Sequence, residues 1–180
     1  GFAFQAEQKK IDLYLAIDQD VPQLLVGDPL RLGQVLQNLL GNALKFSDSG
    51  WVKLSVRKIS VSAHEVVCGF EVTDTGIGIP AEKMELIFSP FSQADASVNR
   101  KYGGSGLGLS IAKNLVQLMQ GEMKVQSGIG QGSSFSFTAT FETPSPEILG
   151  KQIISQKQIS TGFSAISNAV DVFLVESNPF

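Results

Sequence analysis

The chain has 180 residues, enough for one domain of ordinary size and an appendage. A hydrophobic content of 43% with 17% charged residues is typical of a globular protein with a core, and a net charge of −3 argues against nucleic-acid binding. No apolar run reaches the roughly 18 residues that a membrane span needs, and the single cysteine, Cys68, has no internal disulfide partner, so we expect a cytoplasmic protein without membrane contact.

The first half of the sequence predicts a strand, a helix and a hairpin. One segment alternates apolar and polar side chains, as a half-buried strand does. Asp28 and Pro29 mark the start of the helix, because an aspartate side chain caps free N–H groups and proline suits the first helical position. Two strand-like runs joined by a short turn follow as the hairpin. The predicted ranges are 11–18 for the first strand, 29–46 for the helix, and 51–59 and 65–73 for the hairpin.

The second half predicts further helices and a second pair of strands. A glycine-rich turn, DTGIGIP, precedes a short helix, and a long polar stretch leads to a helix that stops at Gly121, a typical C-terminal glycine. Hairpin strands pair antiparallel. We therefore predict an α+β fold, a two-layer α/β sandwich in which a mixed, mostly antiparallel sheet packs on helices. The predicted ranges are 80–87 and 106–120 for the helices, and 122–127 and 133–141 for the strands.

The first long helix carries a polar stripe beside its apolar face. At 100° per residue, one arc of about 80° holds Gln34, Asn38, Asn42 and Lys45. Asparagine is a poor helix former, so two of them four residues apart are unusual there. An amide oxygen is a hard ligand suited to Mg²⁺, and a lysine one turn on can contact a phosphate. A solvated helix face explains the same residues equally well.

Two glycine-rich segments point to a nucleotide. In DTGIG, residues 74–78, the carboxylate of Asp74 can accept a hydrogen bond from a ligand amine, and the glycines let the backbone approach a flat ring. In GGSGLG, residues 103–108, glycines follow two cations and precede a helix N-terminus, whose free N–H groups bind anions. A tight turn and a plain loop are the alternative interpretations of the two segments.

The order of these motifs resembles the catalytic, ATP-binding domain of bacterial hybrid sensor histidine kinases. That domain belongs to the superfamily shared with DNA gyrase, the ninety-kilodalton heat-shock chaperones and mismatch-repair ATPases. NLLGNALKF resembles the N box, DTGIGI and GGSGLGLSI the two glycine boxes, IFSPFSQAD the F box, and GQGSSFSF the last glycine-containing strand motif. The match covers about residues 11–142. It implies the Bergerat-type ATP-binding fold, with ATP and Mg²⁺ as cofactors.

The resemblance assigns roles along a bound ATP. Asp74 would hydrogen-bond the adenine amine. The catalytic candidates are Asn42, which would bind the Mg²⁺ bridging the triphosphate, Asn38 beside it, and Lys45, which would contact phosphate. Phosphoryl transfer depends mainly on such positioning and electrostatic roles. The other residues implied are Gly76, Gly78 and Ile79 in the adenine pocket, Phe46 against the purine, Ser134 near the adenine, Arg100 and Lys101 on the family's lid, and Gly104, Gly106, Leu107 and Gly108 in the hinge and phosphate cradle.

The only histidine does not fit the family's phosphate acceptor. In the family, the acceptor motif continues with Arg/Lys-Thr-Pro on a long helix, whereas His64 lies between two predicted strands. We expect His64 to be a surface turn residue and the acceptor to lie on a separate helical dimerisation domain, so the isolated chain should be inactive alone. Residues 1–10 are then the stub of that domain, and 143–171 a linker. Residues 172–180, with VFLVESNPF, resemble the start of a degenerate receiver domain; a plain linker or a strand that docks on the core explains them equally well.

Two other functions stay open at this point. A regulatory nucleotide-binding module would keep the fold and dock other kinases without transferring phosphate. A hydrolytic ATPase is disfavoured, because the chaperone and gyrase branches carry a glutamate where this chain has Asn38, and an amide cannot activate water as a base. Phe88 and Phe91 either anchor their segment in the core or form an exposed docking surface.

Overall fold

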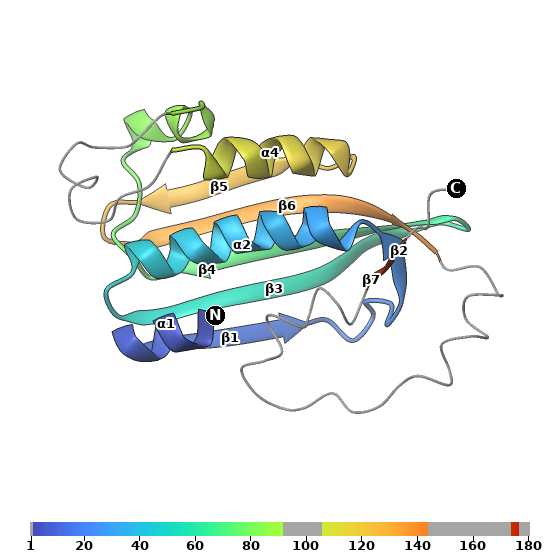
Figure 1. The fold of residues 1–180 in the computed structure, drawn as a ribbon, viewed down its shortest axis with the longest axis horizontal. Helices are drawn as coiled ribbons and strands as arrows, with labels where there is room; N and C mark the ends of the chain where they lie inside the picture. The colour runs from blue at the N-terminus through green and yellow to red at the C-terminus, as the bar shows by residue number, and fades with distance from the viewer. Residues whose placement is uncertain (1, 92–105, 144–173, 177–180) are drawn as a thin grey trace.

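The computed structural model describes residues 2–91, 106–143 and 174–176. They form one sheet with helices packed on one of its faces (Figure 1). Within these ranges, no helix is long and apolar enough to cross a membrane. The elements are α1 (Phe2–Lys9), β1 (Ile11–Ile17), β2 (Leu25–Gly27), α2 (Pro29–Phe46), β3 (Gly50–Val61), β4 (Glu65–Asp74), the 3₁₀ helices η1 (Ala81–Lys83) and η2 (Leu86–Phe88), α4 (Gly108–Leu118), β5 (Met123–Gly128), β6 (Gly132–Glu142) and β7 (Leu174–Glu176).

The seven-stranded sheet is mixed. Its strand order is β1-β3-β4-β6-β2-β7, and β5 also pairs with β6, so β5 and β2 share one edge of that strand. The β3–β4, β4–β6, β5–β6 and β2–β6 pairs are antiparallel, whereas β1 runs parallel to β3 and β7 parallel to β2. This arrangement confirms the predicted α+β class, a two-layer sandwich with a mostly antiparallel sheet.

Most predicted elements are confirmed, with three differences. The helix α2 begins at Pro29, with the Asp28 side chain accepting from the Arg31 N–H at 3.0 Å, as the sequence indicates. The predicted helix near 80–87 is instead two 3₁₀ turns, and α4 begins two residues later than expected, at Gly108. The short β2 was not predicted, because two consecutive apolar residues carry no detectable period.

The end of α4 differs from the prediction that Gly121 ends the helix as a typical C-terminal glycine. The residue with left-handed backbone is Gln120, at φ 57°, rather than Gly121. Gly121 is required for another reason, because a Cβ at this position would overlap the carbonyl oxygen of Thr138 on β6. The glycine therefore lets the end of the helix lie directly against the sheet.

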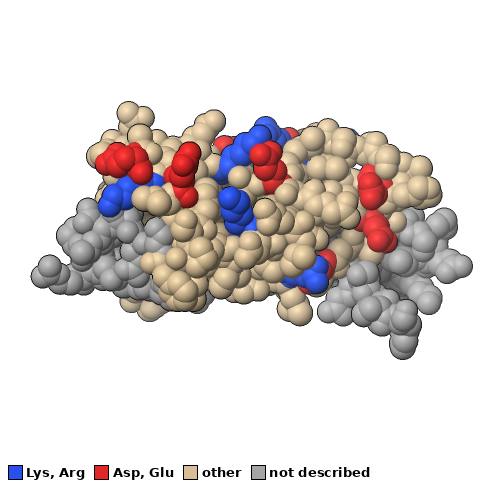
Figure 2. Space-filling view, turned by 90° about the horizontal axis from the view of Figure 1, so that it is seen from above, with Lys and Arg blue, Asp and Glu red and all other residues tan. Residues whose placement is uncertain are grey.

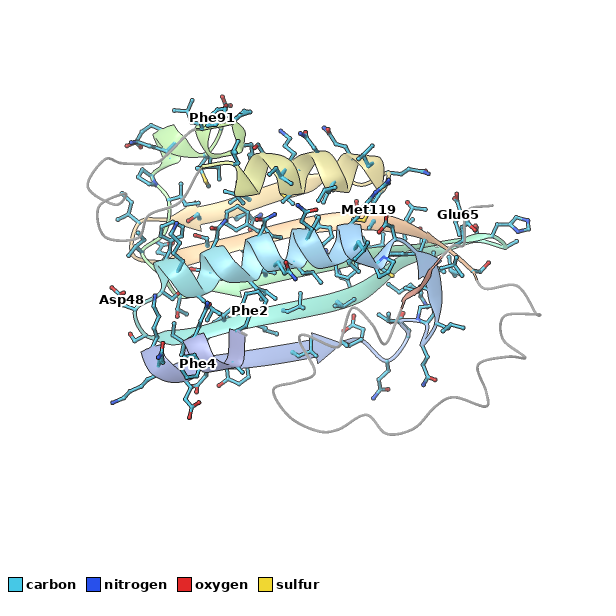
Figure 3. The ribbon with its side chains drawn as sticks, in the orientation of Figure 1. Phe2, Phe4, Asp48, Glu65, Phe91 and Met119 are labelled. Atoms are coloured by element: carbon cyan, nitrogen blue, oxygen red, sulfur yellow. The ribbon has the colours of Figure 1, made fainter. Side chains whose placement is uncertain are left out.

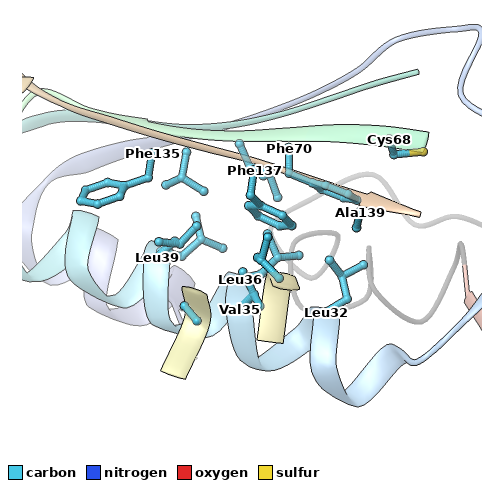
Figure 4. Packing of buried hydrophobic residues seen from close by; sticks show 14 of the residues in the cluster. Leu32, Val35, Leu36, Leu39, Cys68, Phe70, Phe135, Phe137 and Ala139 are labelled. Carbon is cyan, nitrogen blue, oxygen red and sulfur yellow. The ribbon is translucent and has the colours of Figure 1, made fainter. Parts of the chain in front are cut away.

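The core lies between the sheet and α2. Strand alternation turns every second side chain of β4 and β6 toward the helices, including Phe70 and Phe137, whose rings stack at 4.8 Å. Figure 4 shows the aliphatic stripe of α2 facing these rings. Cys68 is fully buried in the same cluster, and burial raises the pKa of its thiol to about 11, which confirms it as a core residue. The buried stripe of α2 consists of Leu32, Val35, Leu36, Leu39, Leu40, Ala43 and Leu44.

The described surface mixes both signs of charge. Lysines and arginines lie beside aspartates and glutamates on the face shown in Figure 2. Salt bridges such as Lys58–Asp20 (3.1 Å) and Lys124–Glu122 (3.1 Å) show the same intermixing. A nucleic-acid-binding face would instead present a basic stripe.

The two terminal segments both contact the sheet. The helix α1 packs against β1 and α2 and buries Ala6, and the chain then turns at Lys10, whose φ is 55°. Near the C-terminus, β7 continues the sheet beyond β2, which is the docked-strand alternative for this segment. Residues 144–171 of the predicted linker lie outside the described residues, as do 172–173 and 177–180, and the assignment of 1–10 and 172–180 to neighbouring domains stays a prediction.

Candidate nucleotide-binding site

The motif residues gather at one end of the sheet. At the left-hand end in Figure 1, β4 and α2 end and α4 and β6 begin. The loop after β4, residues 75–79, lies between the last turn of α2 and the turn that joins β5 to β6. The Ile77 N–H donates to the Phe46 carbonyl at 3.1 Å, and the Gly130 N–H donates to the Ile77 carbonyl at 2.8 Å.

Asp74 is the buried charge of this site. The strand alternation that buries Phe70 and Val72 also turns Asp74 inward, and only 6% of its surface is exposed. Its Oδ1 accepts hydrogen bonds from the N–H groups of Gly76 (2.8 Å) and Ser133 (3.3 Å). Burial raises the pKa of the carboxyl, and these two hydrogen bonds oppose the rise. Both bonds go to Oδ1, so Oδ2 is the oxygen that can accept from a ligand.

Two glycines of the DTGIG loop are required by close approach. A Cβ on Gly76 would overlap the Phe46 carbonyl at the end of α2. Gly78 has φ 73°, and a Cβ there would overlap the carbonyl of Gly128 in the β5–β6 turn. The loop is therefore packed closely between helix and turn, which gives the site beside Asp74 a fixed backbone wall.

Two serines that sequence reasoning missed hold this wall. Ser127 Oγ accepts from the Ile79 N–H at 2.8 Å, donates to the Gly132 carbonyl at 2.8 Å, and lies 3.0 Å from Ser133 Oγ. Both serines lie on the helix-facing side of the sheet, because Ser127 follows the inward Val125 by two residues and Ser133 precedes the inward Phe135 by two. The alternation of inward and outward residues along β5 and β6 is the sequence signal that could have identified both serines.

The predicted Ser134 is not brought to the Asp74 pocket. It is paired with Thr73, one residue before Asp74, so its side chain points to the opposite face of the sheet. There its hydroxyl donates to Glu71 Oε1 at 2.7 Å and lies 3.3 Å from Thr73 Oγ1. Ser133, one residue earlier, occupies the inward position beside Asp74.

The polar stripe of α2 faces the start of α4. A Cβ on Gly108 would lie 2.9 Å from Asn38 Oδ1, so the asparagine and the helix start are in direct proximity. Lys45 Nζ lies 4.8 Å from the centre of the Phe46 ring, and burial lowers the pKa of the Lys45 ammonium. Within the described ranges, no three His, Cys, Asp or Glu side chains cluster, so a cation here would take amide and ligand oxygens.

The start of α4 suits an anion. Gly106 has φ 71°, which confirms a backbone position that favours glycine, and none of the described side chains caps the helix. The Ser110 hydroxyl donates back to the Leu107 carbonyl at 2.9 Å and so does not cap the first N–H groups of the helix, which have no intrahelical partners. The predicted contacts Arg100, Lys101 and Gly104 lie outside the described residues.

The two phenylalanines of the F-box segment behave differently. Phe88 packs on the core, with its ring edge-on to Phe135 at 6.5 Å and Lys113 Nζ 5.0 Å from its centre. Phe91 is 75% exposed and points away from the body of the molecule (Figure 3). The core-anchor interpretation therefore holds for Phe88, and the exposed-patch interpretation for Phe91.

His64 lies far from the site. It is exposed in the β3–β4 turn, next to Glu65 at the right-hand end of Figure 3, whereas Asp74 lies at the other end of β4. Since a strand advances about 3.3 Å per residue, the two residues are roughly 30 Å apart. This confirms His64 as a surface turn residue.

Known proteins resemble the chain over this domain. It matches the family model described as Histidine kinase-, DNA gyrase B-, and HSP90-like ATPase over residues 27–143. It is 44% identical over 161 residues to the hybrid signal transduction protein dokA of Dictyostelium discoideum, covering 87% of this chain and 10% of that protein. It is 43% identical over 135 residues to the signal transduction histidine-protein kinase BarA of Escherichia coli strain K12, covering 75% and 15%. The chain thus spans only 10–15% of the length of these curated relatives.

Solved structures agree in fold. Full-length ShkA in complex with AMPPNP superposes with a TM-score of 0.65 at 34% identity, covering 80% of this chain and 28% of that one. The catalytic domain of histidine kinase ThkA gives a TM-score of 0.58 at 28% identity, covering 79% and 88%. Motif order, fold and similarity agree: the chain belongs to the histidine kinase-, DNA gyrase B- and HSP90-like ATPase family and carries the catalytic ATPase domain of a two-component sensor histidine kinase.

Proposed function

We propose that the chain binds Mg-ATP at this end of the sheet and supplies the γ-phosphate to a histidine on a separate helical domain. The observation that carries the proposal is the Asp74 carboxylate, which is buried and fixed through Oδ1, so that Oδ2 remains to accept a hydrogen bond from a ligand. A buried carboxylate without a cationic partner is unfavourable, so a ligand amine is the partner it suits. The adenine amine of ATP has the required chemistry.

The adenine end of the site comprises Asp74, residues 75–79, Ser127 and Ser133. Asp74 Oδ2 accepts from the adenine amine, Gly76, Gly78 and Ile79 form the backbone wall, and Phe46 lies against the purine. Ser133 takes the role that the sequence suggested for Ser134, because it is the serine on the Asp74 side of the sheet.

The phosphate end comprises Asn38, Asn42, Lys45 and residues 106–108. The Asn42 amide oxygen is a ligand for Mg²⁺, which supplies charge neutralisation for the triphosphate. Lys45 contacts phosphate oxygens, and the glycines before α4 expose its N–H groups to them. Arg100, Lys101 and Gly104 complete this end in the proposal.

The same residues favour transfer over hydrolysis. Asn38 lies beside the start of α4, where a hydrolytic enzyme needs a base to activate water, and an amide cannot take up that proton. The phosphate is therefore kept for a protein acceptor. His64 is too distant, so the acceptor belongs to a helical dimerisation domain of the parent protein, and a receiver domain or response regulator takes the phosphate next. Such a domain works in the cytoplasm, where ATP is supplied.

Calorimetry with a non-hydrolysable ATP analogue tests the proposal, with Mg²⁺ and with a chelator. We expect Mg²⁺-dependent binding by the wild type. Asp74→Asn keeps an oxygen for both backbone hydrogen bonds but presents a donor to the adenine amine, so affinity should fall about 100-fold. Glu71→Gln, which changes the same charge on the opposite face of β4, is the matched control and should bind normally.

Two outcomes would contradict the proposal. Unchanged affinity in Asp74→Asn would mean that the nucleotide binds elsewhere. A folded wild type that binds no nucleotide at millimolar ligand would favour a regulatory module that acts by docking other kinases.

A further inference from the structure

The last turn of α2 is held by a side chain from another helix. The ammonium of Lys9, the final residue of α1, donates to the carbonyls of Leu44 (2.7 Å), Lys45 (3.0 Å) and Ser47 (3.0 Å). A helix leaves its last carbonyls without intrahelical partners, and α2 ends in an extended Ser47 rather than in a glycine cap. Lys9 therefore replaces the missing cap.

The chemistry of this contact suits lysine in particular. An ammonium has three N–H donors, and here three carbonyls converge on it. Its positive charge also lies at the negative end of the α2 dipole. The guanidinium of arginine is planar and presents its donors in a fork, which does not fit three converging acceptors in the same way.

The one remaining carbonyl of this turn holds the nucleotide loop. Phe46 lies between the carbonyls bound by Lys9, and its oxygen accepts the Ile77 N–H at 3.1 Å. Gly76 lies so close to the same carbonyl that a Cβ would not fit. A shift of the last turn of α2 would therefore move or release residues 76–77, beside Asp74.

The helix α1 is fixed well enough to act through this contact. Ala6 is buried against the core, and Phe2 packs on the same cluster. The two ends of α2 are stabilised by different contacts. The Asp28 side chain caps the N-terminus, and the Lys9 ammonium binds carbonyls at the C-terminus.

We propose that Lys9 is a positioning residue for the nucleotide site, which ties α1 through the last turn of α2 to the DTGIG loop. The inference rests on the proposed function for its effect on nucleotide binding. Its structural part, from Lys9 to the Ile77 amide, stands without it. A displacement of α1 then loosens the adenine end and weakens nucleotide binding, with no residue of α1 touching the ligand.

Amide hydrogen exchange and calorimetry on the 180-residue chain test the inference. In Lys9→Met, we expect the Ile77 amide to exchange about tenfold faster, and the affinity for a non-hydrolysable ATP analogue to fall about tenfold, since the three charge-assisted hydrogen bonds of the ammonium are lost and part of that loss reaches the loop. Amides in the centres of β4 and β6 should exchange as in the wild type. Lys10→Met is the matched control: Lys10 is the next residue, is exposed, and carries the same charge.

The outcomes separate the inference from the proposed function. If Ile77 exchanges no faster in Lys9→Met than in Lys10→Met, the inference is wrong, whatever happens to nucleotide affinity. If Lys9→Met does not fold, Lys9→Arg tests the inference instead. This variant keeps the charge but not the fit to three carbonyls, so exchange at the Ile77 amide should still be faster than in the wild type. Exchange at the wild-type rate in Lys9→Arg would overturn the inference. A wild type that binds no nucleotide overturns the proposed function while leaving the exchange result to stand.

Discussion

The two ends of the candidate site differ in how completely the protein itself holds them. At the adenine end, Asp74 Oδ1, Ser127 Oγ and the Phe46 carbonyl each accept a backbone hydrogen bond from the loop of residues 75–79. At the phosphate end, within the described ranges, neither Asn38 nor Asn42 uses its amide in a hydrogen bond, and no side chain caps α4.

This difference matches the two tasks that we propose for the site. A base is recognised by a fixed set of donors and acceptors, and preorganising them reduces the ordering that binding requires. A phosphate that is to leave needs groups whose charge and hydrogen bonds are available to the ligand. In the proposed site, the base pocket is therefore built in advance, and the Asn38 and Asn42 amides are left for the nucleotide and its cation.

The largest expected effect is at a glycine of the adenine end. Gly78→Ala should lower the free energy of unfolding by about 3 kcal/mol, since left-handed backbone costs about 1–2 kcal/mol for alanine and the overlap with Gly128 adds about 1–3. Gly130 has the same φ, 73°, with no described atom within 4 Å of its Cβ position. In urea unfolding, Gly130→Ala should therefore lower the free energy of unfolding by the backbone cost alone. Equal losses of unfolding free energy in the two variants would show that the loop at Gly78 is not closely packed against Gly128.

At the phosphate end, Asn42→Ala should affect the ligand and not the fold. Without the amide oxygen, we expect nucleotide affinity to fall at least about tenfold with Mg²⁺ and to change little with a chelator. Calorimetry under both conditions measures the difference, and Gln37→Ala, an exposed position on the same helix, is the control. If Asn42→Ala lost the same affinity in the chelator, its role would be something other than Mg²⁺ binding.

The pH dependence of stability tests the burial of Asp74. Burial raises its folded-state pKa above the unfolded value, so its contribution to stability is fully present below the unfolded pKa and is lost as pH rises through the folded pKa. Asp74→Asn, which stays neutral, should therefore melt at a higher temperature than the wild type at pH 8, and this advantage should shrink as pH falls to about 4. An advantage that is constant over this range would mean that Asp74 is not desolvated.

Sequence patterns predicted what depends on local chemistry. The Asp28–Pro29 start of α2, the hairpin strands and the position of Asp74 at a strand end all follow from caps, periods and turns. What could not be predicted depends on contacts between distant segments. Examples are the parallel β1–β3 pair and the Lys9 contact with α2.

One error had a local remedy. Ser134 and Ser133 are neighbours with the same chemistry, and the motif alone does not say which one faces the ligand. Counting back in steps of two from the inward Phe137 and Phe135 reaches Ser133, so strand alternation would have corrected the assignment. Family resemblance located the segment, and the period of the strand decides the residue.

The smallest expected effect compares a glycine of α2 with a glycine of the DTGIG loop. Gly41, in the middle of α2, has no described atom within 4 Å of its Cβ position, whereas a Cβ on Gly76 would overlap the Phe46 carbonyl. Gly41→Ala should therefore raise the free energy of unfolding by about 1 kcal/mol, because alanine is the better helix former. Gly76→Ala should lower it by about 1–3 kcal/mol. Urea unfolding of the two variants measures both signs, and a loss of stability in Gly41→Ala would show that the space beside the phosphate end is filled in solution.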